Sequence, residues 1–76
     1  MTSRSVYEVA PRGGEWTVSK RGVERPLHVE ETKDAAVAKG IALGHNNVPA
    51  QLIIKKANGQ IEEERTYGNG PYPPAG

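Results

Sequence analysis

Apolar and polar residues alternate along segment 16–20, and this period of two predicts a half-buried β-strand. An earlier segment, 6–10, is rich in residues that favour strands and predicts another. Pro11 is expected to end the first strand, because proline has no N–H to donate to a continuing ladder. A Gly-Gly pair lies between the segments and supplies the positive φ angles that a tight hairpin turn requires. A third segment, 27–30, also alternates and begins after a proline, which favours a position at the edge of a sheet.

Residues 33–45 have the helical period of an amphipathic helix with an unusually small buried face. The residues on that face are Ala36, Val37, Gly40, Ile41, Leu43 and Gly44. Thr32 is predicted to cap the helix by accepting a hydrogen bond from an amide of the first turn. Each of the two glycines weakens the helix by about 1 kcal/mol relative to alanine, so we expect the helix backbone to lie very close to whatever it covers.

The clearest unit is a second hairpin, in which two strand-like segments, 51–56 and 61–67, flank an Asn-Gly pair. A two-residue loop at this pair predicts that Lys55 lies opposite Glu62. The side chains predicted to face the core are Leu52, Ile54, Ile61 and Tyr67.

The order of these elements, β-β-β-α-β-β, predicts an α+β fold with two layers, an antiparallel sheet and one helix packed on one face. We expect residues 6–67 to form a single domain, with a disordered segment at 1–5 and a Gly/Pro-rich tail at 68–76. Glu63 and Arg65 fall on the core side of the last strand, so either they lie beyond the edge of the helix or the predicted register is wrong. The other face of the sheet is left for solvent or for a partner.

Several short motifs occur in order along the chain. They are Tyr7-x-Val9-x-Pro11, Gly14-x-Trp16-x-Val18, Thr32-Lys33, Asn58-Gly59-x-Ile61, and Arg65-Thr66-Tyr67-Gly68 followed by Pro71-Tyr72-Pro73-Pro74. With this order and spacing the chain resembles DUF2188, a family of short bacterial proteins, from about Tyr7 to the C-terminus. The resemblance supports the fold and implies no activity, catalytic residue, cofactor or partner. Gly40 and Gly44 depart from the family, in which alanine is more common at these positions.

Composition removes several classes of function. Ten basic and nine acidic side chains give a net charge of +1, and there is no cysteine for a disulfide, a thiol nucleophile or a cysteine zinc site. No apolar run approaches the roughly 18 residues that a membrane span needs. His28 is expected to point away from the core and His45 to lie at the helix C-terminus, so neither has the partners that catalysis or metal binding requires. We therefore expect a cytoplasmic, non-catalytic protein with no metal, cofactor or small-molecule substrate.

Basic residues support the leading hypothesis, a module that binds nucleic acid through the open face of the sheet. The residues concerned are Lys20, Arg21, Arg25, Lys55 and Lys56. If the second strand and the last hairpin share one sheet, these side chains could form a stripe that contacts phosphates and base edges. Ordinary cross-strand pairing of the lysines with Glu62 and Glu64 explains the same residues without any ligand.

The alternative hypothesis is a protein-interaction or homodimerisation module that uses a free sheet edge and the tail. The candidate contacts are Ile41 on the helix, Ile53 opposite Glu64 on the open face, and Tyr72 among the tail prolines. A core of this size supplies only about 3–5 kcal/mol, and self-association is a common further source of stability. Salt distinguishes the two hypotheses, because phosphate contacts weaken steeply as salt rises and apolar contacts do not.

Overall fold

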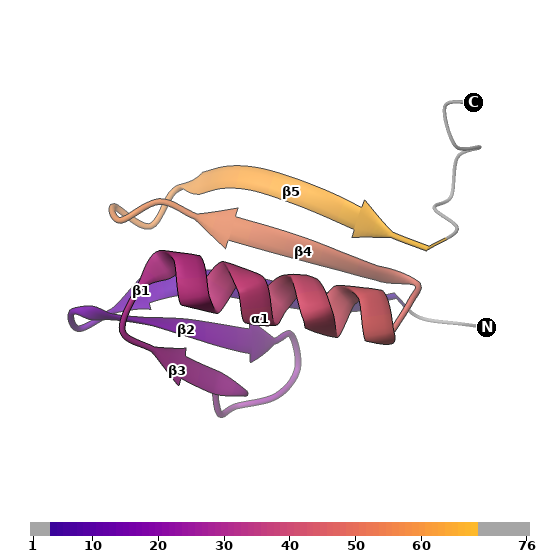
Figure 1. The fold of residues 1–76 in the computed structure, drawn as a ribbon, viewed down its shortest axis with the longest axis horizontal. Helices are drawn as coiled ribbons and strands as arrows, with labels where there is room; N and C mark the ends of the chain where they lie inside the picture. Colours follow the sequence, from indigo (N-terminus) through magenta and orange to yellow (C-terminus); the bar gives the residue numbers. More distant parts are fainter. Residues whose placement is uncertain (1–3, 69–76) are drawn as a thin grey trace.

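The computed structural model describes residues 4–68, which form one sheet covered on one face by a single helix (Figure 1). The elements are β1 (Ser5–Arg12), β2 (Glu15–Lys20), β3 (His28–Glu30), α1 (Lys33–Asn46), β4 (Ala50–Lys55) and β5 (Ile61–Tyr67). The predicted α+β class and the order of elements are confirmed. β1 begins at Ser5, inside the segment 1–5 that was expected to be disordered. The tail from residue 69 onward, with Tyr72, lies outside the described residues.

The strand order is β3-β2-β1-β4-β5, and the sheet is mixed where an antiparallel sheet was expected. Neighbouring strands are antiparallel except for β1 and β4, which run parallel at the centre of the sheet. The reason lies in the connection between β3 and β4, because a helix that crosses the sheet face can return the chain alongside a strand in parallel, whereas a tight turn cannot. β3, which follows Pro26, is at one edge as predicted, and β5 is at the other.

The first hairpin turns at two glycines with positive φ angles, 56° at Gly13 and 87° at Gly14, as predicted. The prediction that Pro11 ends β1 is wrong, since the strand continues to Arg12. In a hairpin with a two-residue loop the next pair from the turn, here Pro11 and Trp16, directs its amides away from the partner strand. Pairing with β4 stops before this point, so the missing N–H of Pro11 removes no ladder bond.

The helix begins and packs as its sequence predicts. Thr32 Oγ1 accepts a hydrogen bond from the backbone N–H of Ala35 over 3.1 Å. A Cβ atom at Gly40 would lie 2.8 Å from Leu52 Cδ1, and one at Gly44 would lie 2.5 Å from Tyr67 Cδ2. The expected close approach is therefore confirmed, because only glycine lets the helix backbone lie this near the sheet. The largest fully buried side chains of the core are Val9, Val18 and Leu52.

The turn of the second hairpin is longer than the two residues predicted. Lys56 N donates to Gln60 O over 2.7 Å, which encloses a loop of the three residues from Ala57 to Gly59. Gly59 has a φ of 90°, the left-handed conformation that such loops need at their last residue. Within the loop, Asn58 Oδ1 accepts from the N–H of Gln60 over 3.0 Å.

A β-bulge at Glu62 offsets this extra loop residue. Lys55 lies opposite Ile61, so the predicted pairing of Lys55 with Glu62 is wrong. Beyond the bulge the predicted register returns, with Ile53 opposite Glu64. Ile61 shares the open face with Lys55 and is 52% exposed, so its predicted place in the core is also wrong.

Candidate interaction site along strand β5

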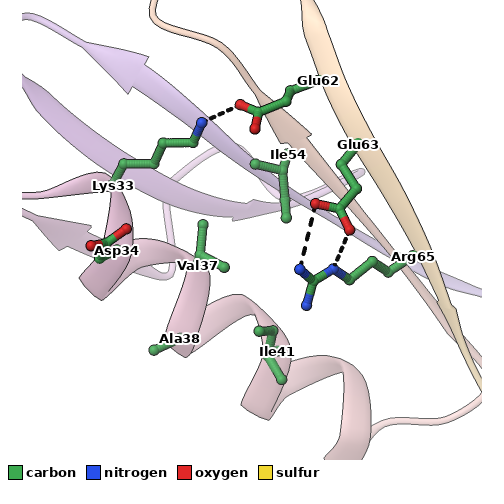
Figure 2. A pocket seen from close by; sticks show the side chains of 9 residues that line it. All are labelled: Lys33, Asp34, Val37, Ala38, Ile41, Ile54, Glu62, Glu63 and Arg65. Atoms are coloured by element: carbon green, nitrogen blue, oxygen red, sulfur yellow. Dashed lines mark hydrogen bonds and ion pairs between the residues drawn. The ribbon is translucent and has the colours of Figure 1, made fainter.

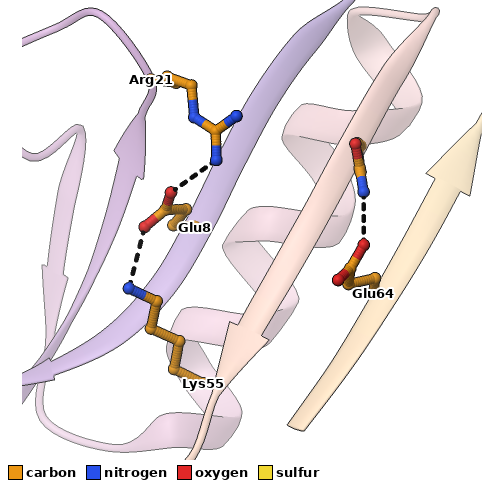
Figure 3. Close-up of polar contacts among 5 residues, drawn as sticks. Glu8, Arg21, Lys55 and Glu64 are labelled. Atoms are coloured by element: carbon orange, nitrogen blue, oxygen red, sulfur yellow. Dashed lines mark hydrogen bonds and ion pairs between the residues drawn. The ribbon is translucent and has the colours of Figure 1, made fainter. Parts of the chain in front are cut away.

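The open face of the sheet carries a three-residue charge cluster centred on Glu8 (Figure 3). One carboxylate oxygen of Glu8 lies 3.3 Å from Arg21 Nη2, and the other lies 3.4 Å from Lys55 Nζ. Two of the predicted basic contact residues therefore share one carboxylate, which neutralises part of their charge. Exposed pairs of this kind add little stability, and their main effect is on the surface potential.

The other predicted basic residues do not join this cluster. Lys20 lies opposite Tyr7, whose side chain is buried in the core, so the alternation places Lys20 on the helix side of the sheet. Arg25 is exposed in the connection between β2 and β3, and Lys56 is exposed where the turn after β4 begins. The expected basic stripe is thus divided between two faces and two ends of the sheet.

Ile53 lies on the open face, as predicted, but is only 7% exposed. Its neighbours across the adjacent strands are Glu8 and Glu64. Gln51, two residues before it on β4, donates from Nε2 to Glu64 Oε1 over 2.7 Å (Figure 3). Ile53 is therefore covered by polar neighbours and presents little apolar surface to a partner.

The two histidines lie apart, and one differs from expectation. His28 is opposite Val18, which is in the core, so it lies on the helix side of the sheet and not on the open face. His45 occupies the last turn of α1, as predicted, with its ring centroid 4.6 Å from that of Tyr67. Within residues 4–68, no group of histidine and acidic side chains is arranged to hold a metal ion.

A groove of about 400 Å³ runs between α1 and the start of β5 (Figure 2). Its apolar lining is made by Val37 and Ile41 of the helix and by Ile54 of β4. Glu63 and Arg65 line the side formed by β5, beyond the helix, which is one of the two outcomes that the sequence left open. The groove exists because α1 packs against the inner strands and meets β5 at Tyr67, near the end of that strand, so the part of β5 at Glu63 and Arg65 is left uncovered.

Two ion pairs bound the groove (Figure 2). Lys33 at the start of α1 pairs with the bulge residue Glu62, and Lys33 Nζ also lies 5.6 Å from the centroid of the Trp16 ring. Arg65 Nε donates to Glu63 over 2.7 Å on the same strand. The hydrogen bond from Arg65 is the main cause that lowers the pKa of Glu63, and Glu63 in turn raises the pKa of Arg65. Both groups are therefore charged at neutral pH.

Strand β5 is the longer of the two sheet edges, with seven residues against three in β3. Ser5 N donates to Pro49 O over 3.1 Å, so the odd-numbered residues along β4 direct their backbone groups toward β1. The even-numbered residues of β4 consequently bond to the odd-numbered residues of β5. Glu64 and Thr66 therefore direct their N–H and C=O groups outward, to an edge that no described segment covers.

Sequence reasoning identified Ile41 and a free sheet edge but did not connect them. The alternation in the last strand already allowed Glu63 and Arg65 to lie beyond the helix, and this was the available signal for a groove. The ion pair between Lys33 and Glu62 had no signal, because it depends on the bulge.

The family model described as an uncharacterized protein conserved in bacteria (DUF2188) matches residues 7–67 of the chain. No curated protein and no solved structure matches this chain. The single helix found within residues 4–68 is too short and too polar to cross a membrane.

Proposed function

Since this chain belongs to DUF2188, a bacterial family that is uncharacterised, we propose a function from its own surface, namely a non-catalytic module that binds a protein segment along strand β5. One observation carries the proposal. A seven-residue edge with outward backbone groups at Glu64 and Thr66 runs directly beside a groove with an apolar lining.

An extended segment fits this arrangement by adding a strand to the sheet. Its main chain would hydrogen-bond to the outward groups of Glu64 and Thr66, which provide affinity without regard to sequence. Every second side chain of the segment would face the helix side, where Val37 and Ile41 line the groove. The charged pair of Glu63 and Arg65 would then favour a segment that carries a polar side chain next to the apolar side chain entering the groove.

The test is a selection of random extended peptides on the protein, followed by amide NMR titration of the selected sequences. We expect shifts in β5 and in the first half of α1. Thr66→Pro removes an outward N–H without touching the ladder to β4, so it should abolish binding, while Thr66→Val keeps the N–H and should preserve it. Selected peptides that bind Thr66→Pro as well as the original chain would refute this site.

Nucleic-acid binding through the open face is the second candidate. It is supported by the exposed guanidinium groups of Arg21 and Arg25 and by the exposed Lys56. If it holds, Glu8→Gln should tighten binding to duplex DNA, because this change frees Arg21 and Lys55 from their shared carboxylate. Salt-sensitive DNA binding at low ionic strength supports this candidate, and its absence contradicts it.

A cytoplasmic site of action is part of the proposal. It is supported by the absence of cysteine, since small domains of oxidising compartments are commonly stabilised by disulfides.

A further inference from the structure

We propose that the partner which best fits β5 is a second copy of this chain, paired antiparallel along the free edge about a two-fold axis at Glu64. The inference rests on the proposed function and names the partner at the same site. The resulting sheet would run continuously through both copies.

The hydrogen-bond phase of the edge allows this pairing. Glu64 directs its N–H and C=O outward, so Glu64 of one copy can exchange both hydrogen bonds with Glu64 of the other. The flanking pair is then Glu63 with Arg65 of the second copy, and the reciprocal pair lies across the axis. These are non-hydrogen-bonded pairs, the positions at which opposite side chains come closest.

Charge selects this register from its neighbours. The neighbouring registers that keep the outward backbone groups paired have their two-fold axis at Glu63 or at Arg65. With the axis at Glu63, Glu63 lies opposite Glu63 of the second copy. With the axis at Arg65, Arg65 lies opposite Arg65. Like charges directly opposite each other destabilise a strand pair, whereas the register centred on Glu64 forms two pairs of opposite charge.

The layers of the fold leave room for the second copy. Directly opposite residues share a sheet face, so both helices lie on the same side of the joined sheet. Because α1 packs over Val9 of β1 and Leu52 of β4, the two helices would be about 20 Å apart, roughly four strand spacings. The two grooves beside β5 would then open toward each other across the seam.

At the two-fold axis itself, two like charges lie opposite each other and weaken the pairing. Glu64 meets Glu64 of the second copy on the open face, and Gln51 of its own chain holds each carboxylate over 2.7 Å. This repulsion makes the association weaker than the edge alone would allow. Glu64→Gln should therefore tighten the dimer severalfold, which distinguishes the proposed axis from pairing at any other edge.

The test uses charge reversal on the full chain, measured by sedimentation velocity over micromolar to millimolar concentrations. Glu63→Arg and Arg65→Glu should each weaken dimerisation by about 30-fold, since each variant turns both flanking pairs from attraction to repulsion. An equimolar mixture of the two variants should dimerise again. In the mixture, the positively charged β5 of one variant pairs with the negatively charged β5 of the other. The hydrogen bond between Glu63 and Arg65 within each chain is lost in both variants and stays lost in the mixture, so its loss cannot explain a recovery of the dimer.

Amide NMR spectra of each variant verify that the monomer still folds. A monomeric original chain at millimolar concentration, or a mixture no more dimeric than its components, would overturn the inference. Thr66→Pro separates the inference from the proposed function. If selected peptides bind β5 and are lost with Thr66→Pro while the original chain stays monomeric, only the self-pairing fails. Thr66 lies two residues from the axis and directs its N–H to the second copy, so a Thr66→Pro protein that dimerises like the original chain would overturn pairing along β5.

Discussion

Replacing Gly40 with alanine sets two opposite effects against each other in one residue. In an exposed helix position the change would stabilise the fold by about 1 kcal/mol, because alanine is the better helix former. At Gly40 the new Cβ would lie 2.8 Å from Leu52 Cδ1 and 3.2 Å from Val9 Cγ2, well inside normal carbon contact distances. Both neighbours are fully buried, so neither can move into solvent. Overpacking of this kind costs about 1–3 kcal/mol, and we expect a net loss of about 1 kcal/mol.

The assay is urea and thermal unfolding, followed by circular dichroism and by the fluorescence of Trp16, the single tryptophan. For a domain of this size a loss of 1 kcal/mol lowers Tm by roughly 4–8 °C. Ala42→Gly, on the exposed side of the same helix, measures the propensity difference without a packing change. Leu52→Val should cost less in the Gly40→Ala background than alone, because it removes the clashing carbon. A Gly40→Ala protein stabilised by the amount that Ala42→Gly loses would refute the packing argument.

Three further predictions concern single groups. Thr32→Ala removes the helix cap and should lower the free energy of unfolding by about 1 kcal/mol, with Thr32→Ser retaining most of it; equal losses for both would contradict the cap. Tyr67→Phe should leave stability unchanged or raise it by up to about 1 kcal/mol, because the buried hydroxyl makes no hydrogen bond of normal geometry with the described residues, although Tyr67 contributes to the raised pKa of Arg65; a clear loss in urea unfolding would show that the hydroxyl does bond to Arg65 or another group. The hydrogen bond from Arg65 lowers the pKa of Glu63 in the folded state. The stability that this bond adds to the fold is therefore fully present above the ordinary carboxyl pKa and is lost as pH falls through the lowered pKa. Glu63→Gln should therefore flatten the acid side of the stability curve, and an unchanged slope would exclude the pair as its source.

Local signals predicted the elements well, and for local reasons. The hairpin glycines have positive φ angles and Thr32 caps the helix, because these properties depend on backbone conformation or on groups a few residues away. The helix propensity lost at Gly40 pointed to a close packing contact, but its partners, Val9 and Leu52, are distant in the chain. In the second hairpin, the predicted core face was correct for Leu52 and Ile54 of β4. It failed at Ile61, where a bulge reverses the alternation.

The candidate site depends on which strands become neighbours, and the residue pattern of a single strand does not show this. Alternation alone placed His28 outside the core, but it cannot say which face of a three-residue edge strand meets the helix; the pairing with Val18 decides that. Likewise, Lys55 has a carboxylate partner on β1 and not on its own hairpin, because β4 lies parallel to β1 at the centre of the sheet.

The sequence by itself determined which segments become strands and helix, where they turn, and which small residues bring the helix onto the sheet. Periodicity, caps and turn residues act over a few positions, so they can be recognised in the sequence before the fold is known. The tertiary structure decided the strand order, the neutralisation of Arg21 and Lys55 by Glu8, and the free edge beside the groove. These depend on which strands become neighbours, and a helical connection leaves that choice open until the core is packed.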